Sequence, residues 1–249
     1  MRIKPNAGVA VGLAVVYMAI FGGVFYASGV EYDAVTDSAE NVRAGLVTPL
    51  AAGAIALVAI TFFLGWWKPA LRERSRVHGW LIAIPIVMVL TLLVGIDYGN
   101  LGELDSELLL WIGIGSLLVG FNEELMYRGL AIVGFRGSVS EGYVWLWTSV
   151  LFGLLHSINF LLGQGLGATL QQVVVTFAIG SGMYIARRTT GLIVVPMVMH
   201  ALWDFSSFTQ SEGRSISGLL SYVALLAVII GLIAGRKHLF ASTESEQTV

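Results

Sequence analysis

Long apolar runs, separated by short polar segments, dominate this sequence. A helix needs about 20 mostly apolar residues to cross the hydrocarbon core of a bilayer. Only 12% of the 249 residues are charged, against about 25% in soluble proteins, and no polar stretch is long enough for a soluble domain. We therefore predict one integral membrane domain over residues 1–249, an all-α polytopic bundle of about eight transmembrane helices at 9–29, 45–67, 79–96, 108–130, 143–162, 168–186, 191–208 and 217–235.

The cationic residues predict the orientation of this bundle, because lysine and arginine are enriched in cytoplasmic loops. With eight spans, one side of the membrane receives Arg2, Lys4, Lys68, Arg72, Arg74, Arg76, Arg128, Arg136, Arg187, Arg188, Arg236 and Lys237. The opposite loops have Arg43 and Arg214 as their only cations and carry Glu31, Asp33, Asp37, Glu40, Asp97, Glu103, Asp105 and Glu107. The sequence therefore predicts a multi-pass protein of the cell membrane with both termini in the cytoplasm.

Charge and cysteine content exclude several classes of protein. The formal net charge of −2 gives no indication of a nucleic-acid partner, since such proteins carry basic patches. The chain has no cysteine, which excludes disulfides, thiolate zinc sites and a cysteine nucleophile.

Three charged residues lie inside the fourth apolar run, in the stretch GSLLVGFNEELMYRGLAIVGF (115–135). A charge within a span costs about 2.5–3.5 kcal/mol on insertion scales and marks a functional site by default. Glu124 and Arg128 are spaced i, i+4, the order that favours an ion pair on one helix face. Glu123 lies about 100° around the helix from Glu124 and cannot share Arg128 equally. The pair has a structural explanation, whereas an unpaired Glu123 would be costly without a function.

Two histidines and an aspartate lie in later runs. The segment VLFGLLHSINF places Phe152 one turn before His156, and VPMVMHALWDF places His200 and Asp204 at i, i+4, where a carboxylate can orient an imidazole. Taken alone, each of these histidines could be a hydrogen-bonded residue that only contributes to helix packing. At 1.5 Å per residue, however, Glu123, His156 and His200 fall at similar depths from the predicted cytoplasmic side. Together they indicate a hydrated catalytic cavity within the membrane.

Three short motifs carry a resemblance to a known family: EELMYR (123–128), FGLLH (152–156) and HALWD (200–204). In type, order and placement on separate apolar runs they resemble the motifs of the CPBP family, which includes the type II CAAX prenyl proteases and the bacterial Abi proteins. The resemblance covers a protease motif core at residues 108–208, while the N-terminal helices at 1–78 contain no such motif.

The resemblance implies an intramembrane endopeptidase that hydrolyses a peptide bond of a membrane-associated substrate, as in CAAX processing. Glu123 and His156 would activate a water, and His200 and Asp204 would stabilise the oxyanion. Glu124, Arg128 and Phe152 would support them. The expected partners are the lipid bilayer and a peptide or protein substrate, which the resemblance allows to be prenylated. No cofactor is favoured, but zinc is an alternative, and its ligands would be Glu123, His156 and His200.

Two alternatives stay open. Buried glutamate, histidine and arginine also form proton relays, which would suit a proton-coupled transporter. A non-catalytic bacteriocin-immunity or scaffold membrane protein could retain the same motifs. Cleavage of a farnesylated CAAX peptide, lost with Glu123→Gln, would separate these alternatives from a protease.

Overall fold

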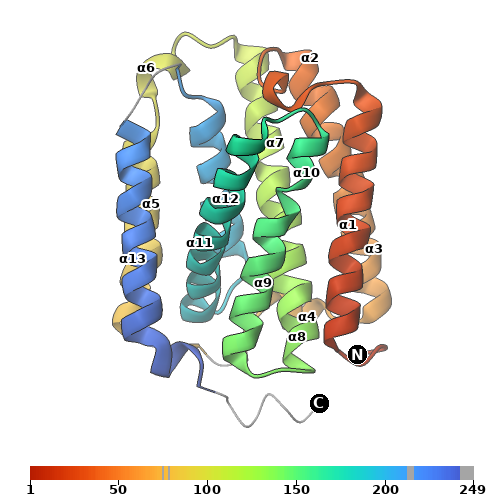
Figure 1. The fold of residues 1–249 in the computed structure, drawn as a ribbon, viewed down its shortest axis with the longest axis vertical. Helices are drawn as coiled ribbons and strands as arrows, with labels where there is room; N and C mark the ends of the chain where they lie inside the picture. Colours follow the sequence, from red (N-terminus) through yellow and green to blue (C-terminus); the bar gives the residue numbers. More distant parts are fainter. Residues whose placement is uncertain (75, 78, 212–215, 242–249) are drawn as a thin grey trace.

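The computed structural model of the chain is an all-helical bundle whose main helices run side by side (Figure 1). It describes residues 1–74, 76–77, 79–211 and 216–241, so Arg214 lies outside the described residues. Within these ranges there is no β-strand, and the predicted all-α class is confirmed.

The helical elements follow one another with short connections. In chain order they are α1 (Ala7–Ser28), η1 (Tyr32–Ala34), α2 (Ala39–Asn41), η2 (Val42–Val47), α3 (Thr48–Leu64), α4 (Trp67–Leu71), η3 (Trp80–Ile82), α5 (Ala83–Gly95), α6 (Tyr98–Leu101), α7 (Ser106–Glu124), η4 (Leu125–Ala131), α8 (Ile132–Arg136), α9 (Glu141–Leu155), α10 (Ile158–Leu161), α11 (Leu166–Thr190), α12 (Val194–Phe208) and α13 (Ile216–Leu239).

Six helical stretches among the described residues are long and apolar enough to cross a membrane: Ala7–Ser28, Ala39–Leu64, Ser106–Arg136, Glu141–Leu161, Leu166–Thr190 and Tyr222–Leu239. The other two predicted spans are helical but short. One is Trp80–Gly95, and the other contains α12, which has 15 residues. Figure 1 shows α5 and α12 aligned with the long helices. A multi-pass helical bundle is therefore shown, whereas a count of about eight spans is not confirmed.

Local sequence explains where several helices begin and end. The Asp105 side chain accepts hydrogen bonds from the backbone N–H groups of Glu107 and Leu108 and so caps the start of α7. Helices α3 and α11 end at Gly65 (φ 69°) and Gly191 (φ 75°). This left-handed conformation is one that glycine adopts without a Cβ clash.

Two segments, η2 and η4, are π-helical. Pro49, at the start of α3, has no N–H to donate. At the end of η2, the Arg43 carbonyl accepts from both the backbone N–H and the Oγ1 hydroxyl of Thr48, the latter at 2.8 Å. The second segment, η4, follows Glu124 directly. The two glutamates therefore lie where α geometry changes to π geometry. Such wide turns are rare and often occur at functional sites.

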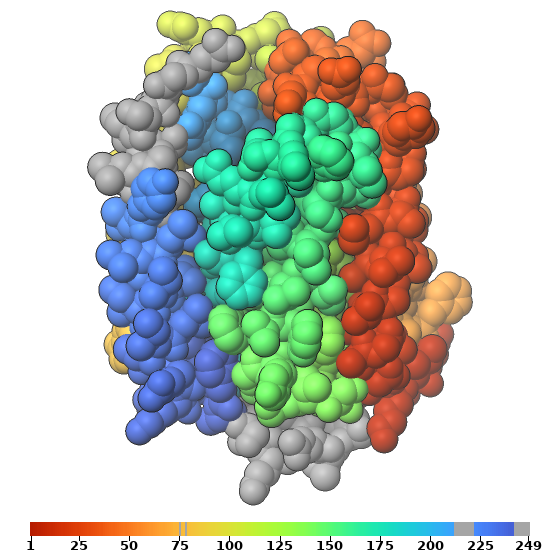
Figure 2. Space-filling model, in the orientation of Figure 1, coloured from red at the N-terminus to blue at the C-terminus, as the bar shows by residue number. Residues whose placement is uncertain are grey.

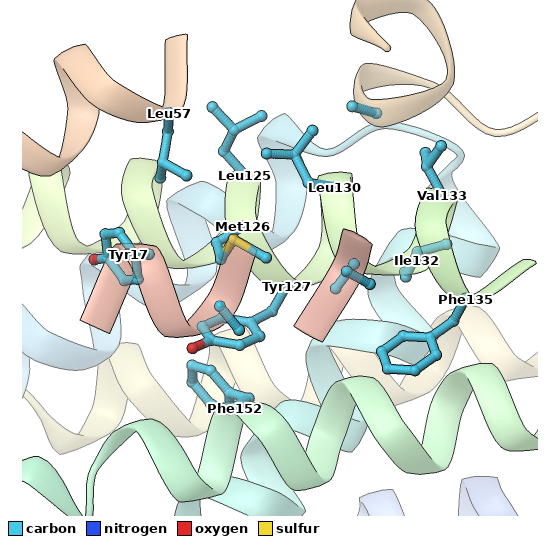
Figure 3. Close-up of a cluster of buried hydrophobic side chains, with 14 of the residues drawn as sticks. Tyr17, Leu57, Leu125, Met126, Tyr127, Leu130, Ile132, Val133, Phe135 and Phe152 are labelled. Atoms are coloured by element: carbon cyan, nitrogen blue, oxygen red, sulfur yellow. The ribbon is translucent and has the colours of Figure 1, made fainter. Parts of the chain in front are cut away.

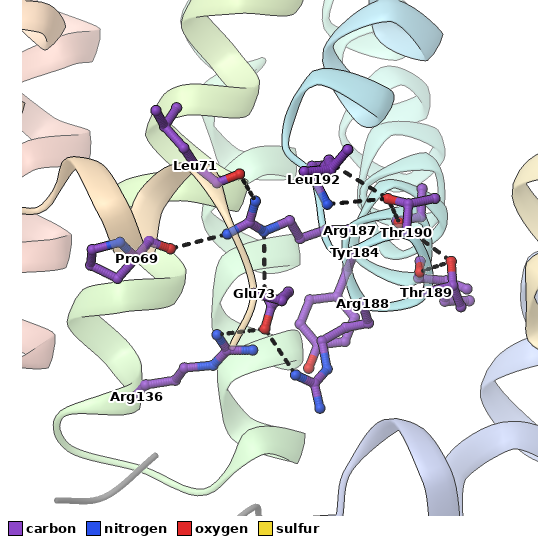
Figure 4. Close-up of polar contacts among 12 residues, drawn as sticks. Pro69, Leu71, Glu73, Arg136, Tyr184, Arg187, Arg188, Thr189, Thr190 and Leu192 are labelled. Carbon is purple, nitrogen blue, oxygen red and sulfur yellow. Dashed lines mark hydrogen bonds and ion pairs between the residues drawn. The ribbon is translucent and has the colours of Figure 1, made fainter. Parts of the chain in front are cut away.

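One end of the bundle is a cationic end, at which α1 begins and α8 and α11 finish. Its centre is Glu73, which has no exposed side-chain area and lies 3.1 Å from Arg187, 3.0 Å from Arg136 and 3.0 Å from Arg188 (Figure 4). Arg136 also contacts Glu141 at 2.6 Å. Phe240, just after α13, packs on Trp145 near the start of α9. Helices α1 and α13 therefore place the described chain ends at the same end of the bundle.

The opposite end, the acidic end, gathers the predicted acidic loops. The Tyr32 backbone N–H donates to the Leu162 carbonyl at 2.9 Å, and the Asn100 side chain donates to the Thr209 carbonyl at 3.0 Å. The loops that follow α1, α5, α10 and α12 thus meet there. The orientation of the two ends relative to the cytoplasm stays a prediction.

The largest core cluster lies between the middle of the bundle and the cationic end (Figure 3). It is built around η4, whose residues Leu125, Met126, Tyr127 and Leu130 have no exposed area. Side chains from α1 and α3, among them Tyr17, complete it. The motif segment of the fourth apolar run is therefore held on all sides by packed neighbours.

Candidate active site

Helices α7 and α12 approach each other closely at Gly120. A Cβ atom on Gly120 would clash with the backbone carbonyl oxygen of Met197 and would lie only 3.0 Å from the backbone nitrogen of Ala201. Because the residue is a glycine, the two backbones can come this near. The end of α7, with its two glutamates, consequently faces His200 on α12.

Glu124 joins two of the three motifs. Its side chain is fully buried, and its Oε1 atom accepts hydrogen bonds from Arg128 Nη1 at 3.0 Å and from His200 Nδ1 at 2.8 Å. The predicted Glu124–Arg128 ion pair is present. The contact with His200 was not predicted, since the sequence does not show which helices face each other.

Two further carboxylates face the other nitrogen of the same ring. His200 Nε2 lies 3.8 Å from Glu123 Oε2 and 3.5 Å from Asp204 Oδ2. Both oxygens are buried and have no hydrogen-bond partner among the residues that the structure describes. Buried polar atoms usually do have one, so these two oxygens are placed to bind a water or a substrate group.

His156 closes α9, where the fifth apolar run breaks before α10. Its Nδ1 lies 3.0 Å from the Phe152 carbonyl oxygen. A carbonyl only accepts, so Nδ1 carries the proton and Nε2 of the neutral ring keeps a lone pair. Phe152 is buried and makes edge contacts with His156 and His200, with ring centroids 5.3 Å and 5.5 Å apart.

Arg128 packs against the Phe152 ring. Its guanidinium carbon is 4.1 Å above the centre of the Phe152 ring, a cation–π geometry. Helix α11 covers the pair through Gly180, where a Cβ would meet Arg128 Nη2 at 2.6 Å and Phe152 Cδ1 at 2.8 Å. Packing therefore fixes the arginine and the aromatic ring against each other.

A cavity of about 410 Å³ is lined by Glu123, Phe152, His156, His200 and Asp204. We refer to it as the catalytic cavity because it contains the candidate catalytic residues. The structure thus places the four predicted catalytic residues and Phe152 on one surface, while Glu124 and Arg128 lie behind it. The remaining walls come from α1, the loop after it, η2, α3, α10 and α11. Much of that surface belongs to the N-terminal segment, in which the sequence shows no motif.

Three polar residues that no motif identified also line the cavity. Asn159 Nδ2 donates to Gln172 Oε1 at 3.0 Å, and Gln172 Nε2 donates to the Tyr32 hydroxyl at 3.2 Å. Burial raises the pKa of Tyr32 to about 12, so the hydroxyl keeps its proton at neutral pH. The three side chains form a hydrogen-bonded row that ends on the Tyr32 hydroxyl, which can still donate a hydrogen bond. The row joins α10, α11 and the loop after α1, and no local sequence pattern predicts it.

Zinc was the cofactor alternative, with Glu123, His156 and His200 as its expected ligands. Carboxylate and imidazole groups are suitable zinc ligands, and three protein ligands make a catalytic site. Within the described ranges, however, no three His, Asp or Glu side chains are grouped so that they could hold a metal ion. Glu123, His156 and His200 supply the right atom types without the spacing.

Comparison with known proteins adds one finding. Residues 105–206 match the family described as "Type II CAAX prenyl endopeptidase Rce1-like", a segment that contains all three motifs. The resemblance seen in the motifs is therefore confirmed for this part of the chain. No curated protein matches the chain.

Proposed function

We propose, from the CPBP/CAAX protease family assignment that this match supports, that the protein hydrolyses a peptide bond through a water activated by Glu123 and His156. The family indicates a CAAX-type intramembrane protease, and our proposal adds the residues and the steps. The observation that carries it is the position of His200 Nε2 between Glu123 Oε2 and Asp204 Oδ2, two buried oxygens without protein partners among the described residues.

In the first step, a water held between Glu123 and His156 attacks the carbonyl carbon of the scissile bond. Its proton passes to the Glu123 carboxylate as the new C–O bond forms, and the carbonyl oxygen becomes an oxyanion. Glu123 then returns the proton to the amide nitrogen as the C–N bond breaks. The products are a carboxylic acid and an amine, so protons and atoms balance. Base catalysis of this kind contributes about 10²–10⁴-fold.

His200 supplies the oxyanion donor in this proposal. A ring whose Nδ1 lies on Glu124 and whose Nε2 faces two carboxylates is placed to carry a proton on each nitrogen. Nε2–H then donates to the oxyanion, an interaction that strengthens as negative charge develops. Asp204, one helical turn away, holds the Nε2 side of the ring. Glu124 and Arg128 are positioning residues, because they act through His200 and not on the substrate.

The proposed steps use no metal; among the residues that the structure describes, no three His, Asp or Glu side chains are grouped to hold one. The proposal also differs from the two open alternatives. A proton-coupled transporter would need Glu123 to titrate but not to catalyse hydrolysis, and an immunity or scaffold protein would need no turnover.

The test uses the purified full-length protein in lipid and a farnesylated CAAX peptide, beside the same peptide without the prenyl group. We expect cleavage by the wild type and a loss of about 10²-fold or more with Glu123→Gln. Glu103→Gln makes the same change on an exposed loop and should retain full activity. Cleavage of both peptides would show that the prenyl group is dispensable. No cleavage of either peptide, or an active Glu123→Gln variant, would refute the proposed function.

A further inference from the structure

Besides the candidate catalytic residues, the cavity is lined by the polar row, which we define as the hydrogen-bonded side chains of Asn159, Gln172 and Tyr32. They come from α10, α11 and η1, and Figure 2 shows α10 and the start of α11 against the segment that follows α1. None of the three takes part in the proposed steps of hydrolysis. Away from the catalytic residues most of the wall is apolar, so the row offers a bound chain directed hydrogen bonds there.

The two ends of the row are held in place by their own backbones. The Tyr32 N–H donates to the Leu162 carbonyl at 2.9 Å. The Asn159 N–H donates to the His156 carbonyl at 3.2 Å, and the Asn159 carbonyl accepts from the Gln164 N–H at 2.9 Å. Asn159 is also buried. The row is therefore ordered before a ligand arrives, which lowers the entropic cost of binding.

The direction of its hydrogen bonds leaves the row with one acceptor and one donor for a ligand. Asn159 donates to Gln172 through Nδ2, while its Oδ1 atom accepts nothing from the residues that the structure describes. At the other end, the Tyr32 hydroxyl accepts from Gln172 Nε2, which leaves its proton to be donated. No lysine or arginine among the described residues lines the cavity. A neutral acceptor and a neutral donor complement the N–H and C=O groups of a peptide main chain.

The row begins next to the catalytic residues. Asn159 follows His156 by three residues, and both line the cavity. Side chains with this spacing on a helical turn lie about 5–6 Å apart, and an extended chain advances about 3.3 Å per residue. A polypeptide bound at His156 therefore reaches the row about two residues from its scissile bond.

We infer that the polar row is a subsite for the substrate main chain about two residues from the scissile bond, in which Asn159 Oδ1 accepts from a substrate N–H and the Tyr32 hydroxyl donates to a substrate carbonyl. Gln172 is a positioning residue, because it fixes the direction of both ends of the row. The subsite contacts backbone groups and so sets the register of the bound chain independently of its side chains. The inference rests on the proposed function for the scissile bond, but binding needs no turnover.

The acceptor end is tested by binding of a fluorescent farnesylated CAAX peptide to the full-length Glu123→Gln variant in lipid, which keeps the peptide intact. Esters replace the peptide bonds around the scissile bond one at a time, and each removes one N–H. We expect one ester to raise Kd about 3- to 10-fold, as the loss of one hydrogen bond does. Adding Asn159→Ala should make all esters bind like the peptide. No binding, or the same ester pattern with Asn159→Ala, would overturn the inference.

The donor end is tested by cleavage kinetics of Tyr32→Phe, which keeps the ring and removes only the hydroxyl. We expect KM to rise about 3- to 10-fold with little change in kcat, since the hydroxyl binds the substrate and takes no part in the chemistry. Tyr26→Phe, at an exposed position of α1, is the matched control. A row that only ties helices together would lower the unfolding temperature and leave KM unchanged, which would overturn the inference.

The two proposals fail in different ways. A peptide that binds through Asn159 but is not cleaved by the wild type would refute the proposed function and leave the subsite in place. Cleavage by the wild type, with no effect of Asn159→Ala on the ester series and none of Tyr32→Phe on KM, would refute the subsite and leave the proposed function in place.

Discussion

Replacing Glu124 by glutamine tests whether its buried ion pair with Arg128 is structural. In the native protein, Oε1 alone accepts from both Arg128 and His200, and Oε2 has no partner among the described residues. A glutamine can keep its carbonyl oxygen at the Oε1 position and put its amide where Oε2 lies. The substitution therefore preserves shape and both hydrogen bonds while it removes the charge that compensates Arg128.

The distances give the size of the expected effect. At the 3.0 Å separation of Arg128 Nη1 and Glu124 Oε1, Coulomb's law with an effective dielectric constant of about 20 gives about 5.5 kcal/mol. Breaking a buried ion pair on one side typically costs about 3–5 kcal/mol, because the remaining charge stays buried. We expect Glu124→Gln to destabilise the protein by about 3–5 kcal/mol. At about 2–4 °C per kcal/mol for a chain of this size, the unfolding midpoint should fall by about 6–20 °C.

The assay is a double-mutant cycle read by thermal unfolding of the purified protein in detergent, using its tryptophan fluorescence. Arg128→Met alone should destabilise the protein less than Glu124→Gln, since it leaves Glu124 with His200 as a charged neighbour. The double variant removes both charges, and its loss should be smaller than the sum of the single losses by about 2–3 kcal/mol. Additive losses would refute the pairing. A Glu124→Gln variant that unfolds like the wild type but is inactive would show that Glu124 acts in the chemistry and not in the support.

Three other outcomes are expected. In the metal-free mechanism, Asp204→Asn retains most peptidase activity and Asp204→Ala loses about 10²-fold; an inactive Asn variant together with a chelator-sensitive wild type would establish a metal site instead. Gly180→Ala should lower stability by about 1–3 kcal/mol, because its Cβ would displace Arg128 or Phe152. Gly167→Ala, in open space on the same helix, should be neutral or stabilising by thermal unfolding. A C-terminal reporter that is active only outside the cytoplasm should stay silent, and strong reporter activity would remove one span from the predicted eight.

The glutamates, Arg128, the two histidines and Asp204 could be found from the sequence because ionisable groups are costly at that depth in a membrane, whereas Phe152 was found only through the family resemblance. The Glu124–His200 contact could not be found, since it depends on the approach of α7 to α12 at Gly120. Nothing in a local pattern specifies which faces of two helices meet. The burial of Glu73 among three arginines was missed for a similar reason, because charges in a short connection usually face water.

The number of membrane-spanning helices could not be predicted reliably from the sequence either. Counting apolar residues treats each predicted span as facing lipid along its whole length. Helix α12 has 15 residues, and part of one face, with His200 and Asp204, lines the cavity. A helix whose polar face is turned inward needs less apolar length than a helix surrounded by lipid. The sequence of α12 therefore does not show whether it spans the membrane, although its position in the bundle brings His200 and Asp204 to the site.

The catalytic cavity has two kinds of wall, and their origins in the chain differ. The candidate catalytic groups come from α7, α9 and α12, all within the segment that matches the family. The apolar wall opposite them includes Phe21 and Phe25 of α1, Leu46 of η2 and Leu50 of α3, all outside that segment. In the proposed hydrolysis, the first wall must be held within small tolerances, whereas the second wall would contact the bound polypeptide. Substitutions at the four apolar side chains of the second wall would therefore alter which polypeptide fits. Substitutions at Tyr17 of α1, which packs in the core around η4, would instead disturb the segment that follows Glu123.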